Sequence, residues 1–128
     1  MIAKILGSTN WQENPVATLK DIKNTLGMGG IIACRLEANG YVKFANGFTI
    51  QWGNGDFVTN SYMSEIIFPT AFSDVPWIAI PNDSLWGVST RSVAYGIGWN
   101  IGASTNTKAR FVTDSLGPQG YHWIAIGV

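Results

Sequence analysis

The feature that most constrains the fold of this chain is the dipeptide Asn46-Gly47, which separates two short alternating runs. The runs cover residues 41–44 and 48–52, and both place apolar side chains at every second position. Asn-Gly in this setting is the strongest short-range hairpin signal, because both residues tolerate the positive φ angles of a tight turn. The sequence therefore predicts an antiparallel hairpin over residues 41–52.

Further strand-like runs follow the hairpin at a spacing of roughly ten residues. The predicted strands are 56–60, 64–68, 77–81, 92–100, 109–113 and 122–128. Turn-rich segments at 82–84, 102–107 and 115–120 separate the later strands. Many short strands with regular turns are typical of an all-β fold, and the pattern predicts a β-sandwich.

The N-terminal segment has a different sequence pattern, with helical rather than strand-like periodicity, and contains one expected helix. Asn14 can act as the N-cap, and Leu19, Ile22 and Leu26 recur at helical spacing before Gly27 ends the helix. A helix of about three turns is too short to be stable alone in water. Its apolar stripe fits the a and d positions of a minimal coiled coil, so either a three-helix collar or packing on its own domain would hold it. Both alternatives stay open.

This difference in sequence pattern divides the chain into two parts. We expect a collar segment with a short helix at 1–30 and a β-sandwich domain at 31–128. The chain has 46% hydrophobic but only 12% charged residues, against about a quarter charged in an ordinary globular domain. A lone monomer could not cover so much apolar surface comfortably. We therefore expect an obligate oligomer.

Charge and hydropathy exclude several classes of partner. The net charge is zero and the eight cations form no cluster, so we expect no nucleic-acid binding. Residues 1–7 are too short and too weakly apolar for a signal peptide, and no run approaches a membrane span, so we expect no membrane insertion.

Catalytic and metal chemistry find little support. The eight carboxylates are scattered, and the sequence carries neither a nucleophile elbow nor a phosphate loop, so we expect no enzyme, no catalytic residue and no cofactor. Cys34 lies in an apolar run and is expected to be a buried, inert thiol. His122 is the only histidine; three copies on a trimer axis could bind a metal, but packing beside Trp123 is the expectation, and no metal site is predicted.

A glycine-rich run at 95–102 alternates strictly between large and small residues. The large residues therefore share one face of a strand, and Gly96, Gly98 and Asn100 share the other. We expect either a neighbouring strand or another subunit to approach the glycine face closely.

Four segments resemble the C-terminal domains of bacteriophage tail fibres, in the same order and over most of the chain. These are the hairpin GYVKFANGFTIQWG at 40–53, FPTAFSDVP at 68–76, the ending YHWIAIGV at 121–128, and the stretch 14–27. The family pattern has proline where this chain has Ala45, which affects only the expected turn geometry. Segment 68–76 also resembles H-type lectins, which bind sugars as trimers.

The resemblance implies a homotrimeric tip on a virion tail fibre that binds a bacterial surface receptor during host attachment. The receptor would be a cell-surface glycan such as lipopolysaccharide or an outer-membrane receptor, and the rest of the fibre would lie upstream. Two alternatives are a structural trimerisation cap and a secreted sugar-binding lectin. The middle of the chain, 82–120, matches no family motif, so the specificity is expected there.

Six tryptophans are many for 128 residues. Trp52, Trp77 and Trp123 lie in strand patterns and are expected in the core, whereas Trp86 lies in a polar loop. We expect the loops 82–91, 102–108 and 114–121 to cluster at one end of the sandwich. The receptor-binding candidates are Asp83, Trp86, Arg91, Asn106, Lys108, Asp114, Gln119 and Tyr121. For each of them, a solvated or interface role is the alternative.

Overall fold

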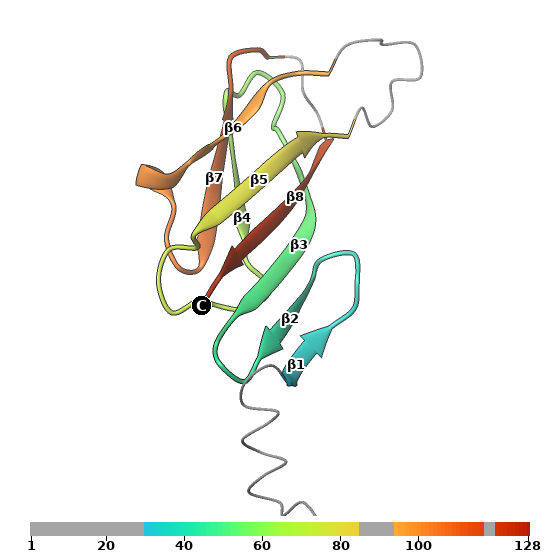
Figure 1. Ribbon diagram of the computed structural model, residues 1–128. Coiled ribbons are helices and arrows are strands. Elements are labelled where there is room, and N and C mark those ends of the chain that lie inside the picture. The colour runs from blue at the N-terminus through green and yellow to red at the C-terminus, as the bar shows by residue number, and fades with distance from the viewer. Residues whose placement is uncertain (1–29, 85–93, 117–119) are drawn as a thin grey trace, which may run out of the picture.

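The computed structural model describes residues 30–84, 94–116 and 120–128 (Figure 1). The helix predicted at 14–27 lies outside the described residues. So do three of the receptor-binding candidates, Trp86, Arg91 and Gln119.

The described residues form two antiparallel sheets. The strands are β1 (Ile31–Arg35), β2 (Gly40–Phe44), β3 (Thr49–Asp56), β4 (Met63–Ile67), β5 (Ile78–Asp83), β6 (Ile97–Asn100), β7 (Lys108–Thr113) and β8 (Gly120–Gly127), and a 3-10 turn, η1 (Ile101–Ala103), joins β6 to β7. One sheet has the strand order β1-β2-β3-β8-β5, and the other has the order β4-β7-β6. The two sheets lie face to face (Figure 1), so the predicted all-β sandwich is confirmed.

The Asn46-Gly47 hairpin forms as predicted. Lys43 pairs with Thr49 across the turn, and Gly47 has a φ of 92°, a conformation that side chains disfavour. The Asn46 side chain accepts a hydrogen bond from the Phe48 backbone N–H at 3.0 Å, which closes the turn locally. This hairpin delivers β3 to the centre of the larger sheet.

Strand boundaries differ from the predictions where pairing overrides local turn preference. The predicted turn at 82–84 is strand as far as Asp83, because Asn82 and Asp83 pair with His122 and Tyr121 of β8. Conversely, the strand predicted at 56–60 does not form, because β3 ends at Asp56 and residues 57–60 are not in a strand. The hydrogen bonds gained by pairing across strands outweigh the local preference of Asn and Asp for turns.

The core between the sheets is rich in aromatic rings. The Phe68 ring packs edge-on against Phe72 and Trp123, with ring centroids 5.0 and 5.7 Å apart. The buried apolar residues are Phe57, Ile66, Phe68, Phe72, Ala79, Ala109, Phe111, Tyr121, Trp123 and Ala125. Trp123 is therefore a core residue, as expected.

Trp52 is not a core residue, and the prediction that its indole anchors the core is wrong. Neighbours in a strand point to opposite faces, and here the inward side chain is Gln51. The Gln51 amide donates to the Thr70 carbonyl at 2.8 Å and accepts from the Thr70 N–H at 3.0 Å, so its polar atoms are satisfied inside. The Trp52 indole lies on the opposite face and donates to the Glu37 carbonyl at 2.9 Å.

Two further core expectations are wrong. Trp77 precedes β5 and is 62% exposed, with its ring against that of Phe48 at the rim of the sheet. Cys34 is exposed rather than buried, because β1 is an edge strand whose residues are almost all exposed.

The glycine-rich run alternates as predicted. Ile97 and Trp99 pack against the core, whereas Gly98 and Asn100 are exposed. No neighbouring strand of the described part of the chain covers the glycine face: a Cβ at Gly96 would meet no atom within 4 Å, and one at Gly98 would meet only Val112 Cγ2, at 4.0 Å. The other expectation, that another subunit approaches this face, stays a prediction.

Candidate functional site

The receptor-binding candidates do not gather at one end of the sandwich. We call the upper end the end where β3 and β5 finish and β8 begins, at the top of Figure 1. Asp83 and Asp114 lie at the upper end, whereas Asn106 and Lys108 lie at the start of β7, at the opposite end. The six residues of β7 separate the two groups by about 20 Å. The expectation of a single cluster of three loops is therefore wrong.

Tyr121 is a core residue rather than an exposed loop residue. Its ring packs between Phe57 and Phe111, with centroid distances of 5.2 and 5.3 Å, and only 1% of the residue is exposed. Its hydroxyl lies 2.7 Å from Ser64 Oγ. Burial raises the pKa of the Tyr121 phenol, the Ser64 hydrogen bond opposes this shift, and the charge of Asp56 adds to it.

Asp83 and Asn106 also have structural partners. The buried Asp83 carboxylate accepts a hydrogen bond from the Tyr95 backbone N–H at 2.8 Å, which ties the end of β5 to the approach to β6. The Asn106 side-chain amide donates to the Phe72 backbone carbonyl at 3.1 Å, and the Asn106 backbone carbonyl accepts from the Phe72 N–H at 2.9 Å. Both side chains therefore stabilise the sandwich.

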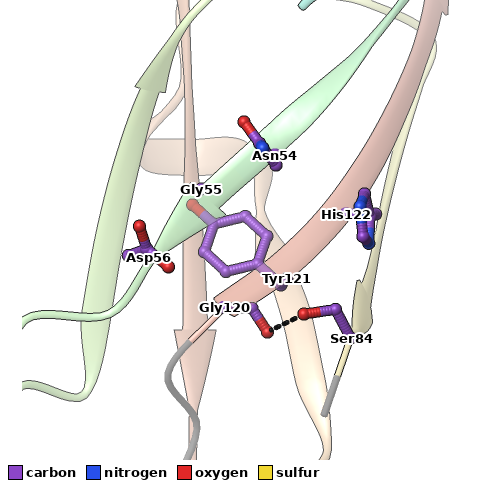
Figure 2. Close-up of a pocket in the computed structure, with 7 residues that line it drawn as sticks. All are labelled: Asn54, Gly55, Asp56, Ser84, Gly120, Tyr121 and His122. Atoms are coloured by element: carbon purple, nitrogen blue, oxygen red, sulfur yellow. Dashed lines mark hydrogen bonds between the residues drawn. The ribbon is translucent and has the colours of Figure 1, made fainter. Parts of the chain in front are cut away.

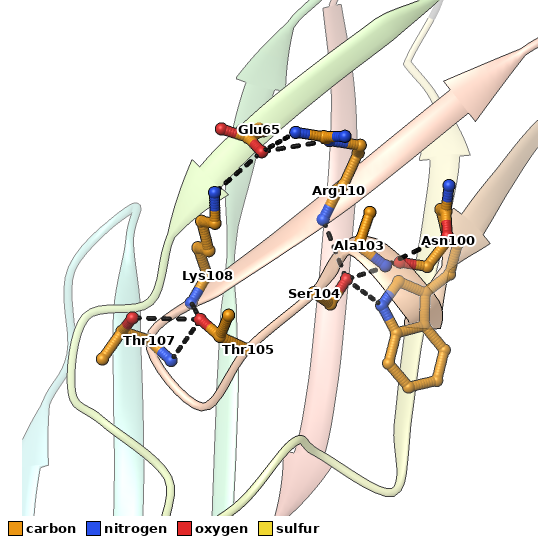
Figure 3. A network of polar contacts seen from close by, with 9 residues as sticks. Glu65, Asn100, Ala103, Ser104, Thr105, Thr107, Lys108 and Arg110 are labelled. Atoms are coloured by element: carbon orange, nitrogen blue, oxygen red, sulfur yellow. Dashed lines mark hydrogen bonds and ion pairs between the residues drawn. The ribbon is translucent and has the colours of Figure 1, made fainter.

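Lys108 belongs to a surface network on the three-stranded sheet (Figure 3). Glu65 Oε1 accepts from Lys108 Nζ and Arg110 Nε, both at 3.0 Å. The hydrogen bonds from Lys108 and then Arg110 lower the pKa of the Glu65 carboxyl. Ser104 Oγ accepts from the Arg110 backbone N–H, which joins the network to η1. Exposed ion pairs of this kind contribute little to stability. In this network the Lys108 ammonium is already paired with Glu65.

Asp114 is exposed and follows β7 at the upper end, so it remains a candidate. The candidates Trp86, Arg91 and Gln119 fall outside the described residues, and their roles remain predictions.

A cleft of about 230 Å³ opens at the upper end (Figure 2). Its lining consists of Asn54, Gly55, Asp56, Ser84, Gly120, Tyr121 and His122. Asn54 and His122 are directly paired across β3 and β8, and both side chains are exposed. Ser84 Oγ donates to the Gly120 carbonyl at 2.8 Å, and this bond holds the residue that directly follows β5 against the start of β8.

The backbone around the cleft is held from both sides. The Asn54 N–H donates to Asn39 Oδ1 at 2.9 Å, and the Asn54 carbonyl accepts from Trp123 Nε1 at 3.4 Å. These contacts fix the strand, so the Asn54 amide is presented from a rigid element. The cleft thus combines an amide, the Asp56 carboxylate and an imidazole, which can donate and accept hydrogen bonds side by side.

Sequence reasoning did not select Asn54, Asp56 or His122 for receptor binding. A usable signal existed, because both Asn54 and His122 interrupt an otherwise apolar alternation, Ile50-x-Trp52 in β3 and Ile124-x-Ile126 in β8. The pairing of β3 with β8, however, appears only in the tertiary structure.

Neither a metal cluster nor a membrane helix is found in the ranges that the structure covers. Within 30–84, 94–116 and 120–128, no three His, Cys, Asp or Glu side chains gather closely enough to hold a metal ion. In the same ranges no helix has the length and apolar character needed to cross a bilayer.

Two antiparallel sheets packed face to face, with a cleft at one end, define a β-sandwich domain. The family described as "Putative tail fiber protein gp53-like, C-terminal" matches residues 43–128. The chain belongs to this family of tail fibre C-terminal domains, and it is part of a virion tail fibre. No curated protein matches the chain.

Solved pyocin fibres have a similar fold. An N-truncated R2-type pyocin tail fiber has a TM-score of 0.67 at 20% identity, over 88% of this chain and 44% of that chain. The C-terminal region of a P. aeruginosa R2 pyocin fiber gives the same TM-score and identity, over 88% of this chain and 30% of that chain. An N-truncated R1-type pyocin tail fiber has a TM-score of 0.63 at 19% identity, over 89% of this chain and 99% of that chain. The chain spans less than half the length of the first two structures.

Proposed function

We propose that this domain is the receptor-binding tip of its tail fibre, that it works as a homotrimer, and that it binds a bacterial surface glycan through the cleft at the upper end. Residues 1–30 would connect the tip to the rest of the fibre. The observation that carries the proposal is the cleft itself, which presents Asn54, Asp56 and His122 from two paired central strands.

The chemistry of the cleft fits a sugar. Hydroxyl groups need acceptors and donors side by side, and a carboxylate beside an amide and an imidazole supplies both. The exposed His122 ring also offers a flat face on which sugar C–H groups can pack. The volume of about 230 Å³ is below the roughly 300–1,000 Å³ of pockets for drug-sized ligands, which suits one small polar unit at a time.

The test is binding of the purified 128-residue protein to whole bacteria, with soluble lipopolysaccharide as competitor. The double variant Asn54→Ala, His122→Ala should lose at least tenfold in cell binding and keep its melting temperature, because both side chains are exposed. The control is Lys108→Ala, a partly exposed polar side chain at the opposite end, which should bind as well as the parent protein.

Treatment of the cells separates the receptor classes. Periodate, which cleaves sugar diols, should abolish binding, whereas protease treatment should not. If protease alone abolishes binding, the receptor is an outer-membrane protein and the glycan proposal is wrong.

A structural trimerisation cap is the second candidate, and the apolar outer side of the larger sheet favours it. A stable trimer that adheres to no cell of the host range would support the cap and contradict receptor binding. The family assignment leaves the secreted lectin without support, since the matched family is one of fibre proteins.

A further inference from the structure

One side of the five-stranded sheet is unusually apolar for a sheet surface. We call the outer face the side of β2, β3, β8 and β5 that points away from the three-stranded sheet. Residues paired across strands share a face, so the register defines its rows. One row contains Val42, Ile50, Ile126 and Ile78, the next contains Gly40, Trp52, Ile124 and Ile80, and a third contains Asn54, His122 and Asn82.

The first two rows carry no charged side chain, although antiparallel sheets that face water usually alternate apolar-in with polar-out. Ile78, Ile80 and Ile124 are 40%, 51% and 40% exposed in the single chain. Gly40 makes the surface flat, because the Trp52 indole lies where a side chain at position 40 would stand.

The outer face is large enough to be an interface. Four strands of five to eight residues give an area of about 300–500 Å², the polar third row included. The aromatic stack of Phe44, Phe48 and Trp77 borders it and extends it, with ring centroids 5.7 and 6.2 Å apart. Exposed apolar patches beyond a few hundred Å² mark interaction sites, and a typical stable interface uses roughly 800 Å² on each partner.

The exposed apolar residues of the three-stranded sheet do not form a comparable surface. Ile67 and Met63 lie on the outside of the three-stranded sheet, but Glu65, Lys108 and Arg110 lie among them as a partly exposed ion network. That side suits solvent, whereas the outer face does not. A bacterial glycan, rich in hydroxyl and charged groups, is a poor match for rows of isoleucine and a tryptophan.

From these observations we infer that the outer face is the contact surface between copies of this chain, with three outer faces turned toward a common axis and the three-stranded sheets outside. A second copy supplies the same uncharged aliphatic surface. The third row, which carries Asn54 and His122, then lies at the upper mouth of this shared core. The clefts would form a ring around the axis, at the seams between subunits. This inference deepens the proposed function and rests on it for the trimer and for the role of the cleft.

The first test is the oligomeric state of two charged variants. Ile78→Glu introduces a carboxylate into the outer face, about 13 Å along the strand from the cleft row. Light scattering should show its mass falling from three chains of 13.9 kDa to one, with the β signal retained. The control Ile67→Glu alters an isoleucine that is 81% exposed on the other sheet, and it should remain trimeric. A trimeric Ile78→Glu variant would overturn the inference.

A labelling test avoids any disruption of the fold. In a Cys34→Ser background, a thiol at Ile80→Cys should react with a maleimide at least tenfold more slowly than one at Ile67→Cys. Equal rates would mean that the outer face is open in the assembled protein, and would overturn the inference.

The position of the clefts is tested by cross-linking. In the same background, a short bis-maleimide should join His122→Cys chains covalently and should not join Ile67→Cys chains. Lack of cross-links at His122→Cys would place the clefts away from the axis. None of these measurements uses a ligand, so a failure of cell binding would contradict the receptor proposal alone.

Discussion

The ring of Tyr121 lies directly over Gly55, its cross-strand partner in β3. A Cβ at position 55 would lie 2.5 Å from both Cζ and Oη of that ring and 2.9 Å from Ile66 Cγ2. Gly53 and Trp123 repeat the arrangement two residues along, where a Cβ would lie 2.7 Å from the indole. The inward glycines of β3 therefore make room for the aromatic rings of β8, which fill the core beneath the cleft.

Gly55→Ala should destabilise the domain, because the added methyl overlaps the buried Tyr121 ring. The expected loss in free energy of unfolding is about 1–3 kcal/mol, measured by chemical denaturation. The control is Gly98→Ala in β6, where a Cβ meets only Val112 Cγ2 at 4.0 Å. That substitution should be neutral or stabilise by up to about 1 kcal/mol, because alanine has less backbone entropy to lose on folding. Equal losses would contradict the steric explanation.

Gln51→Met should cost about 2–6 kcal/mol in the free energy of unfolding, although methionine is similar in size and apolar. The substitution leaves both the N–H and the carbonyl of Thr70 without their buried partner, and each unsatisfied group costs about 1–3 kcal/mol. Thr49→Val provides the comparison, since it removes a single hydrogen bond to the Gly47 carbonyl and should cost about 1 kcal/mol. A smaller loss for Gln51→Met than for Thr49→Val would rule out this account.

Tyr121 should make stability fall at alkaline pH. Its folded pKa is raised above the ordinary value of 10.0, so the unfolded chain releases this proton first. The stabilisation is therefore complete below about pH 10 and is lost as the pH rises through the folded pKa. Melting temperatures between pH 9 and 11 should fall less steeply for Tyr121→Phe than for the parent protein. Parallel slopes for Tyr121→Phe and the parent protein would contradict this assignment.

Asp83→Ala should lower stability without abolishing cell binding. The substitution removes the buried carboxylate that accepts from the Tyr95 N–H, and hydrogen bonds to charged groups contribute about 1.5–3 kcal/mol. Asp114→Ala, an exposed carboxylate at the same end, should leave the melting temperature unchanged. If Asp83→Ala abolished adhesion at full stability, Asp83 would be a receptor ligand, as the sequence alone had suggested.

Local patterns in the sequence were sufficient to predict the all-β sandwich. The turn at Asn46-Gly47 and the alternating runs after it depend only on backbone preferences and on the period of two along a strand. The fibre motifs at 40–53, 68–76 and 121–128 likewise indicated the tail fibre family. These features are properties of neighbouring residues, so they can be read without knowing which strands pair.

The placement of the candidate site required the tertiary structure, because alternation shows that two faces exist but not which one is covered. Gln51 and Trp52 illustrate this, since the polar residue turned inward once the Thr70 peptide was available as its partner. Similarly, Asp83 and Tyr121 looked like loop residues until the pairing of β5 with β8 placed them in strands. The sequence determined the all-β class and most of the strands, although it did not predict β1 and predicted a strand at 56–60 that does not form. The pairing of distant strands decided which side chains form the core, the cleft and the apolar outer face.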